Sequence, residues 1–124
     1  MIKKILVADD EIETLQLLER KLSAAGYEVV KAISGQEAIT RIKKFLPNLI
    51  LMDIVLPDID GSEVIKTIKD DPLTQHIPVI FLSGIVTRGD DHAKLEVKVG
   101  SRLYPAIPKP FQIEQLLSEI RKIL

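Results

Sequence analysis

Two hydrophobic periods alternate along the chain. Short, nearly continuous apolar runs are followed by longer segments in which apolar residues recur at helical spacing. The short runs predict strands at residues 5–8, 27–31, 49–52, 79–82 and 103–107. The longer segments predict helices at residues 11–25, 34–45, 62–69, 87–98 and 113–123. This alternation predicts one α/β domain over residues 1–124, in which helices cover both faces of a parallel sheet.

Local signals mark several of the predicted boundaries. Ser34 followed by Glu37 is the capping-box pattern that begins a helix, and Gly26 is typical of the residue that ends one. Two segments fit their elements less well. The apolar stripe of residues 87–98 is weak, and Pro105 within the last run favours an edge strand or a bulge.

Composition narrows the function classes. The formal net charge is −1, so the chain has no electrostatic reason to bind nucleic acid. Cysteine is absent, which excludes disulfides and thiolate metal sites. The apolar N-terminal run is too short for a signal peptide or a membrane span, and we expect a cytoplasmic protein.

Polar side chains stand where the predicted strands end. Asp9 and Asp10 follow the first strand, Asp53 the third, Ser83 the fourth and Lys109 the fifth. The carboxyl ends of parallel strands meet at one edge of the sheet, where ligands bind in such folds. Each residue alone has an ordinary explanation, as a turn, cap or solvated charge. Their order, each at a strand end, favours one site.

Three carboxylates held together need a cation or protons. Oxygen ligands without cysteine or a histidine pair suit Mg²⁺ better than zinc, and His76 and His92 have no partner at ligand spacing. A carboxylate can attack phosphorus and form an acyl phosphate. A metal ion and a lysine would then supply positive charge around the phosphoryl oxygens.

Four segments resemble the signature segments of response-regulator receiver domains: Leu6–Glu11, Leu51–Gly61, Phe81–Gly84 and Pro108–Phe111. The resemblance covers essentially the whole chain. It implies a flavodoxin-like fold with five parallel strands in the order 2-1-3-4-5, flanked by five helices.

The resemblance also implies a metal site. Asp10 and Asp53 would bind Mg²⁺ directly, together with the backbone carbonyl of Val55. Asp9 would act on the metal through water.

The resemblance assigns the phosphoryl chemistry as well. Asp53 would be the phosphorylated residue, Ser83 would bond a phosphoryl oxygen, and Lys109 would pair with it. The donor would be the phosphohistidine of a histidine kinase or phosphotransfer protein, or a small phosphodonor. The chain would be a signalling switch that catalyses its own phosphorylation and dephosphorylation, rather than an enzyme with other substrates.

The implied output surface comprises the fourth helix, fifth strand and fifth helix of the predicted order, roughly residues 87–124. A partner, or a second copy, would bind there. Ser83 and an aromatic residue on the fifth strand would act as the switch. Counting back from Lys109 gives Ala106 for that residue, whereas counting on from Gly100 gives Tyr104.

Two side chains would control the lifetime of the phosphorylated form. In the family, variable residues beside the path of the attacking water lie two positions after the acceptor and two after the serine. Here these are Val55 and Ile85, which are apolar and cannot orient water by hydrogen bonding. We expect slow dephosphorylation.

Three other functions compete with this interpretation. A receiver-like module that does not use phosphate would have no need of the complete acidic and lysine set. An aspartyl phosphohydrolase would want an acid two residues after the nucleophile, where Val55 stands. A nucleotide-binding domain would need a glycine-rich phosphate loop, which the chain lacks.

Overall fold

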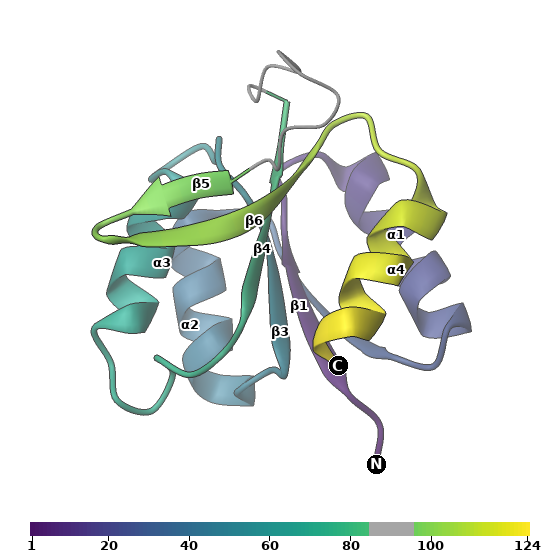
Figure 1. Ribbon diagram of the computed structural model, residues 1–124, viewed down its shortest axis with the longest axis horizontal. Coiled ribbons are helices and arrows are strands. Elements are labelled where there is room, and N and C mark those ends of the chain that lie inside the picture. The colour runs from purple at the N-terminus through teal and green to yellow at the C-terminus, as the bar shows by residue number, and fades with distance from the viewer. Residues whose placement is uncertain (85–95) are drawn as a thin grey trace.

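The computed structural model describes residues 1–84 and 96–124 (Figure 1). The described helices are α1 (Ile12–Ala24), α2 (Gly35–Phe45), α3 (Gly61–Lys69) and α4 (Ile113–Ile123). The strands are β1 (Lys4–Ala8), β2 (Glu28–Ala32), β3 (Leu49–Asp53), β4 (Val79–Ser83), β5 (Glu96–Val99) and β6 (Arg102–Pro108).

The strands form one six-stranded sheet in the order β2-β1-β3-β4-β6-β5. The pairs from β2 to β6 are parallel, and β5 is antiparallel to β6. The α/β class is therefore confirmed. The first four strands have the expected order 2-1-3-4, and β6 takes the place expected of a fifth strand. The strand β5 is an addition to the predicted sheet.

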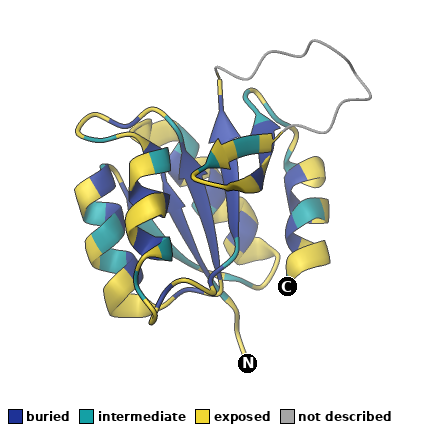
Figure 2. Ribbon diagram, turned by 60° about the vertical axis from the view of Figure 1, so that its left-hand side comes forward, coloured by how far each residue is buried: buried dark blue, intermediate teal, exposed yellow. Residues whose placement is uncertain are grey.

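The sheet separates two apolar clusters. One contains buried residues of α2 and α3, such as Ile42 and Ile65, and the other contains buried residues of α1 and α4, such as Leu18 and Leu116. Figure 1 shows these helix pairs on opposite sides of the sheet, and Figure 2 shows the buried strands between them. Within the described part of the chain, no helix is long and apolar enough to cross a membrane.

The helix expected at residues 87–98 is wrong at its C-terminal end, because Glu96–Val99 forms β5. Polar and apolar residues alternate here with the period of a strand, and Val97 and Val99 pack against the α2–α3 cluster. Gly100 then turns the chain with a φ of 63°, a conformation that glycine adopts without strain. Residues 87–95 lie outside the described residues.

The position of Pro105 also corrects an expectation. Its strand, β6, is not at the edge, because it has β4 on one side and β5 on the other. Pro105 is the last residue of β6 paired with β5, and pairing with β4 begins at Ala106. Proline is thus tolerated inside the sheet at the point where β6 changes neighbours.

The start of α2 is held by side chains, and the Ser34 half of the capping-box pattern is confirmed, because its hydroxyl accepts a hydrogen bond from Glu37 N. The Glu37 carboxylate accepts its hydrogen bond from Ile33 N, one residue before the cap, and not from Ser34 N. Asp58, in the loop after β3, supplies a second carboxylate at this helix end. Its oxygens accept hydrogen bonds from the first two helical amides, Gly35 N and Gln36 N.

Candidate functional site

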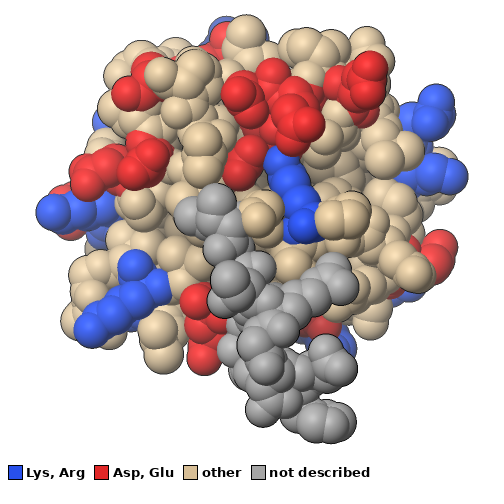
Figure 3. Space-filling view, turned by 90° about the horizontal axis from the view of Figure 1, so that it is seen from above, with Lys and Arg blue, Asp and Glu red and all other residues tan. Residues whose placement is uncertain are grey.

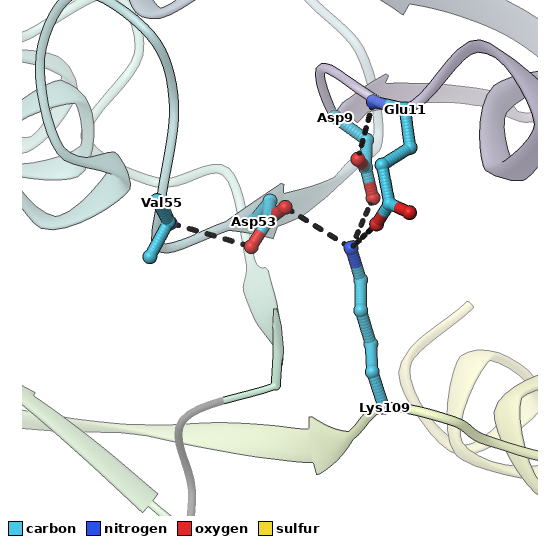
Figure 4. Close-up of polar contacts among 5 residues, drawn as sticks. All are labelled: Asp9, Glu11, Asp53, Val55 and Lys109. Atoms are coloured by element: carbon cyan, nitrogen blue, oxygen red, sulfur yellow. Dashed lines mark hydrogen bonds and ion pairs between the residues drawn. The ribbon is translucent and has the colours of Figure 1, made fainter.

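Three of the predicted side chains meet at the carboxyl ends of the strands. Asp9 follows β1, Asp53 ends β3, and Lys109 follows β6. The expectation that these residues come together is confirmed by their direct contacts (Figure 4). The same end of the molecule, seen from above in Figure 3, carries a group of acidic side chains next to a basic one.

The Lys109 ammonium is the centre of these contacts. Its Nζ lies 2.5 Å from Asp9 Oδ2, 3.0 Å from Asp53 Oδ2 and 3.3 Å from Glu11 Oε1. The Lys109 side chain is 16% exposed. Its backbone is fixed to the neighbouring strand, because Lys109 N donates to the Ser83 carbonyl at 2.9 Å. One largely buried cation therefore compensates carboxylates that follow or end two neighbouring strands, β1 and β3.

Asp9 is fully buried, and its oxygens have protein partners. Its Oδ2 contacts Lys109, and its Oδ1 accepts a hydrogen bond from Glu11 N at 2.9 Å. Glu11 is a contact that the sequence reasoning missed, although it stands directly after the acidic pair. Its exposed carboxylate completes the set around the ammonium.

The environment changes the pKa values of this pair. Burial raises the pKa of Asp53 above its ordinary value and the charge of Asp9 adds to this, while the Lys109 hydrogen bond opposes it. For Lys109, burial alone would lower the pKa. Hydrogen bonds and charges from Asp9 and Asp53 outweigh burial and raise the pKa of Lys109. The lysine therefore stays protonated beside a carboxylate whose ionised form is disfavoured by burial.

Asp10 completes an acidic cluster. One carboxylate oxygen from each of Asp9, Asp10 and Asp53 lies within 4.8 Å of the others. Asp9 and Asp53 are buried, and Asp10 is exposed. Such an all-oxygen set, open to solvent on one side, fits Mg²⁺, which keeps several waters when it binds protein.

The loop after β3 positions the remaining groups. Val55 N donates to Asp53 Oδ1 at 3.3 Å, and Val55 as a whole residue is 54% exposed. Gly61 N donates to the Ile54 carbonyl at 2.7 Å and closes the loop at its other end. The sequence reasoning gave Gly61 no role. The other residue proposed to shield the site, Ile85, lies outside the described residues.

Ser83 ends β4 and is 1% exposed. In the sheet it stands opposite Pro108, the residue before Lys109. The serine and the lysine thus come from neighbouring strand ends, as expected from their positions in the sequence.

Tyr104 lies on β6, away from the strand end, and is buried. Its ring packs edge-to-face on Phe81 with centroids 6.0 Å apart, and the Lys69 ammonium lies 5.8 Å from its centroid. Ala106, the other candidate for the switch position, pairs directly with Phe81 in the sheet. The two candidates share one face of β6 and one apolar cluster.

Comparison with known proteins gives a consistent result. The response regulator receiver domain family matches residues 5–121. The response regulator PleD of Caulobacter vibrioides is 37% identical over 123 residues, which are 99% of this chain and 26% of PleD. The polar-differentiation response regulator DivK of Brucella ovis is 34% identical over 124 residues, which are 100% of this chain and 98% of DivK. The chain therefore spans about a quarter of one relative and nearly all of the other.

A similar solved structure is the response regulator protein TrrA of Thermotoga maritima, which was crystallised with Mg²⁺ and BeF. It superimposes with a TM-score of 0.82 at 28% identity, covering 99% of this chain and 100% of TrrA. This agreement confirms the flavodoxin-like fold that the sequence resemblance implies.

Proposed function

This chain belongs to the receiver domain family of response regulators, and we propose that Asp53 is the residue that accepts the phosphoryl group. One observation carries this proposal. Asp53 ends the central strand β3, and its carboxylate belongs to the acidic cluster and lies 3.0 Å from the Lys109 ammonium. A nucleophile toward phosphorus needs such a setting, with positive charge at hand for the phosphoryl oxygens.

The reaction transfers the group from nitrogen to oxygen. A carboxylate oxygen of Asp53 attacks phosphorus, the acyl phosphate O–P bond forms, and the P–N bond of a donor phosphohistidine breaks. The imidazole leaves with the electron pair of that bond and takes up a proton. A small donor such as acetyl phosphate loses acetate instead. The donor in a cell would be a histidine kinase or a phosphotransfer protein.

Lys109 has a role before and after transfer. Its hydrogen bond to Asp53 Oδ2 opposes the effect of burial on the pKa of Asp53, and so favours the ionised nucleophile. After transfer, the same ammonium pairs with a phosphoryl oxygen. Ser83, at the neighbouring strand end, would donate a hydrogen bond to another.

Mg²⁺ would be held by Asp10, Asp53 and the backbone carbonyl of Val55, with Asp9 acting through water. The clustered carboxylates support this assignment, as does the crystal structure of TrrA in complex with Mg²⁺ and BeF. When bound, the ion offsets the charge of the carboxylates and of the phosphoryl oxygens. In the structure Asp9 is buried against Lys109, which suits an indirect role.

We propose that the receiver domain spans residues 1–124 and acts in the cytoplasm. Its output would be a change in the conformation of one of its surfaces. Ser83 and Tyr104 would form the switch. The surface would be the C-terminal part of the chain, where β5, β6 and α4 are the described elements of the region expected to bind an output partner or a second copy. Since Lys109 N bonds to Ser83, a new contact at the phosphoryl group reaches both β4 and β6. Phosphorylation would then shift the population of two surface states.

Mass spectrometry of the intact protein tests the acceptor. The wild-type chain is incubated with acetyl phosphate and Mg²⁺, beside Asp53→Asn and the control Asp60→Asn. Asp60 precedes α3 in the same loop, is exposed, and makes no side-chain cap hydrogen bond. We expect one phosphoryl group on wild type and on the control, and none on Asp53→Asn. Equal labelling of all three would place the acceptor elsewhere, and no labelling of wild type would favour a module that works without phosphate.

Amide hydrogen exchange tests the output surface. Exchange of wild type is compared with and without beryllofluoride and Mg²⁺, which mimic the phosphoryl group. We expect altered protection in residues 96–124. Changes confined to the strand ends around Asp53 would mean that the signal leaves by another route.

A further inference from the structure

The outer strand β5 offers an unused row of backbone groups. It pairs with β6 on one side, and no strand of residues 1–84 or 96–124 pairs with its other side. Figure 1 shows this strand at the end of the sheet, beside β6. A sheet edge of this kind is a template for pairing with another strand.

Pro105 determines the direction of these groups. In an antiparallel pair, opposite residues alternate between pairs that exchange two backbone hydrogen bonds and pairs that exchange none. Pro105 lacks an N–H, so its pair with Glu96 is of the second kind. Lys98 is then also in a pair without hydrogen bonds, and Val97 is bonded to β6. The N–H and C=O groups of Glu96 and Lys98 therefore point away from β6.

The geometry of the turn between β5 and β6 also indicates that the backbone groups of Glu96 and Lys98 point outward. Gly100 and Ser101 form a two-residue connection between Val99 and Arg102, and the positive φ of Gly100 fits the first position of a type II′ turn. Such a connection is closed by a hydrogen-bonded pair. Alternation from Val99 again leaves Lys98 and Glu96 with outward backbone groups.

We propose that the outer edge of β5 pairs antiparallel with β5 of a second copy of this chain, about a two-fold axis at Val97. In this register Glu96 of each copy lies opposite Lys98 of the other. The two pairs use all the outward groups of both residues and join the two sheets into one. A two-fold interface of this kind is closed and presents the same patch twice.

Charge selects this register over its neighbours. The side chains of Glu96 and Lys98 are exposed and lie on the same face of β5, and Val97 points to the opposite, partly buried face. With the axis at Val97, both cross-strand pairs are of opposite charge. An axis at Lys98 or at Glu96 would place like charges directly opposite, which is unfavourable. The edge is complementary to itself in one register.

The contact is short, so a weak dimer is expected, whose formation depends on concentration. The strand β5 lies within residues 87–124, the region expected to bind an output partner or a second copy. The inference therefore rests on the proposed output surface and specifies its occupant and the backbone groups that bind it, but it does not depend on phosphate chemistry.

Sedimentation velocity over a dilution series of the unphosphorylated protein at low salt tests the proposal. The variants are Glu96→Lys, Lys98→Glu and the double exchange. Both positions are exposed, so circular dichroism should show an unchanged fold. Glu28→Lys is the matched control, since Glu28 is an exposed residue of β2, the strand at the opposite edge of the sheet.

Wild type and Glu28→Lys should dimerise equally. Each single reversal creates two like-charge pairs and should weaken dimerisation about tenfold or more. The double exchange should restore it. A mixture of the two single variants should form a heterodimer, because each supplies the charge that the other needs.

Three results would overturn the proposal: a monomer at every concentration, a dimer insensitive to the single reversals, or a double exchange that fails to restore association. The series is repeated with Asp53→Asn, which should dimerise as wild type does. The Asp53→Asn series distinguishes the dimerisation proposal from the phosphoacceptor proposal, because each of the two can be wrong while the other is right.

Discussion

Gly61 lies directly against the backbone carbonyl of Asp53. A Cβ atom at position 61 would stand 2.0 Å from that oxygen and 2.9 Å from Met52 Cγ, far closer than atoms can pack. The glycine is thus required by close approach of two backbones, at the residue that carries the proposed chemistry.

We predict that Gly61→Ala destabilises the fold by about 2–3 kcal/mol and slows phosphorylation, because the end of β3 must move. Gly84→Ala is the control, since a Cβ there meets nothing within 4 Å among residues 1–84 and 96–124. Thermal unfolding and the rate of labelling by acetyl phosphate check both effects. If Gly61→Ala were as stable as the control, the loop would accommodate the added methyl group without loss of stability, which would contradict the prediction.

Mg²⁺ should raise the melting temperature of wild type, because it relieves repulsion in the acidic cluster and binds the folded state. Asp10→Ala should lose most of this increment.

Lys109→Ala should have a larger Mg²⁺ increment than wild type. The substitution leaves Asp9 buried without its cation, and so lowers the stability of the metal-free protein by about 3 kcal/mol. Differential scanning calorimetry with and without Mg²⁺ measures each change. Asp60→Ala, which alters charge in the nearby loop, should respond as wild type; the same Mg²⁺ response in Asp10→Ala would move the metal elsewhere.

Asp58 should make stability depend on acidic pH. The backbone amides of Gln36 and Gly35 hold the pKa of this carboxyl below its ordinary value of 3.8. A depressed pKa contributes stability that is fully present above the ordinary pKa and is lost as pH falls through the folded value. Asp58→Asn should therefore melt a few degrees below wild type at neutral pH, and the difference should shrink below about pH 4. Melting curves from pH 7 to pH 3 test this, and a difference constant over that range would contradict it.

The phosphorylated form should be long-lived. Val55 follows Asp53 by two positions, donates its N–H to the Asp53 carboxylate, and offers water no side-chain hydrogen bond. Val55→Asn should speed loss of the phosphoryl group several-fold, and Ile85→Glu should act in the same direction. Val55→Ile, which stays apolar, is the control. Decay is followed at fixed Mg²⁺ by intact mass, and equal rates in wild type and both polar variants would rule out shielding.

Much of this site was accessible from the sequence, for a physical reason. Parallel strands end at the same edge of a sheet, so polar residues that follow apolar runs must converge. This rule placed Asp9, Asp53 and Lys109 together, although they lie far apart in the chain. It could not identify Glu11, whose contact depends on the direction of the turn after β1, or Gly61, whose need arises from packing between two backbones.

The region of β5 was predicted wrongly because two periods compete there. The strict alternation from Glu96 to Val99, followed by Gly100, is the signature of a hairpin, but four residues are too few to outweigh the preceding helix-like stretch. The tertiary partner decides the outcome, since Val97 and Val99 are packed against the cluster that contains Phe81 and Tyr104. Sequence period alone carries no information about that surface.

The division of the interior by the sheet has a consequence for how the sequence can vary. Ile80 and Phe81 are chemically bonded neighbours, yet they belong to different apolar clusters on opposite faces. Phe81 shares its cluster with Tyr104, which is remote in the chain. A substitution at Phe81 should therefore be compensated during evolution by a change at Tyr104 and not at Ile80. Adjacent residues of β4 should thus vary independently of each other.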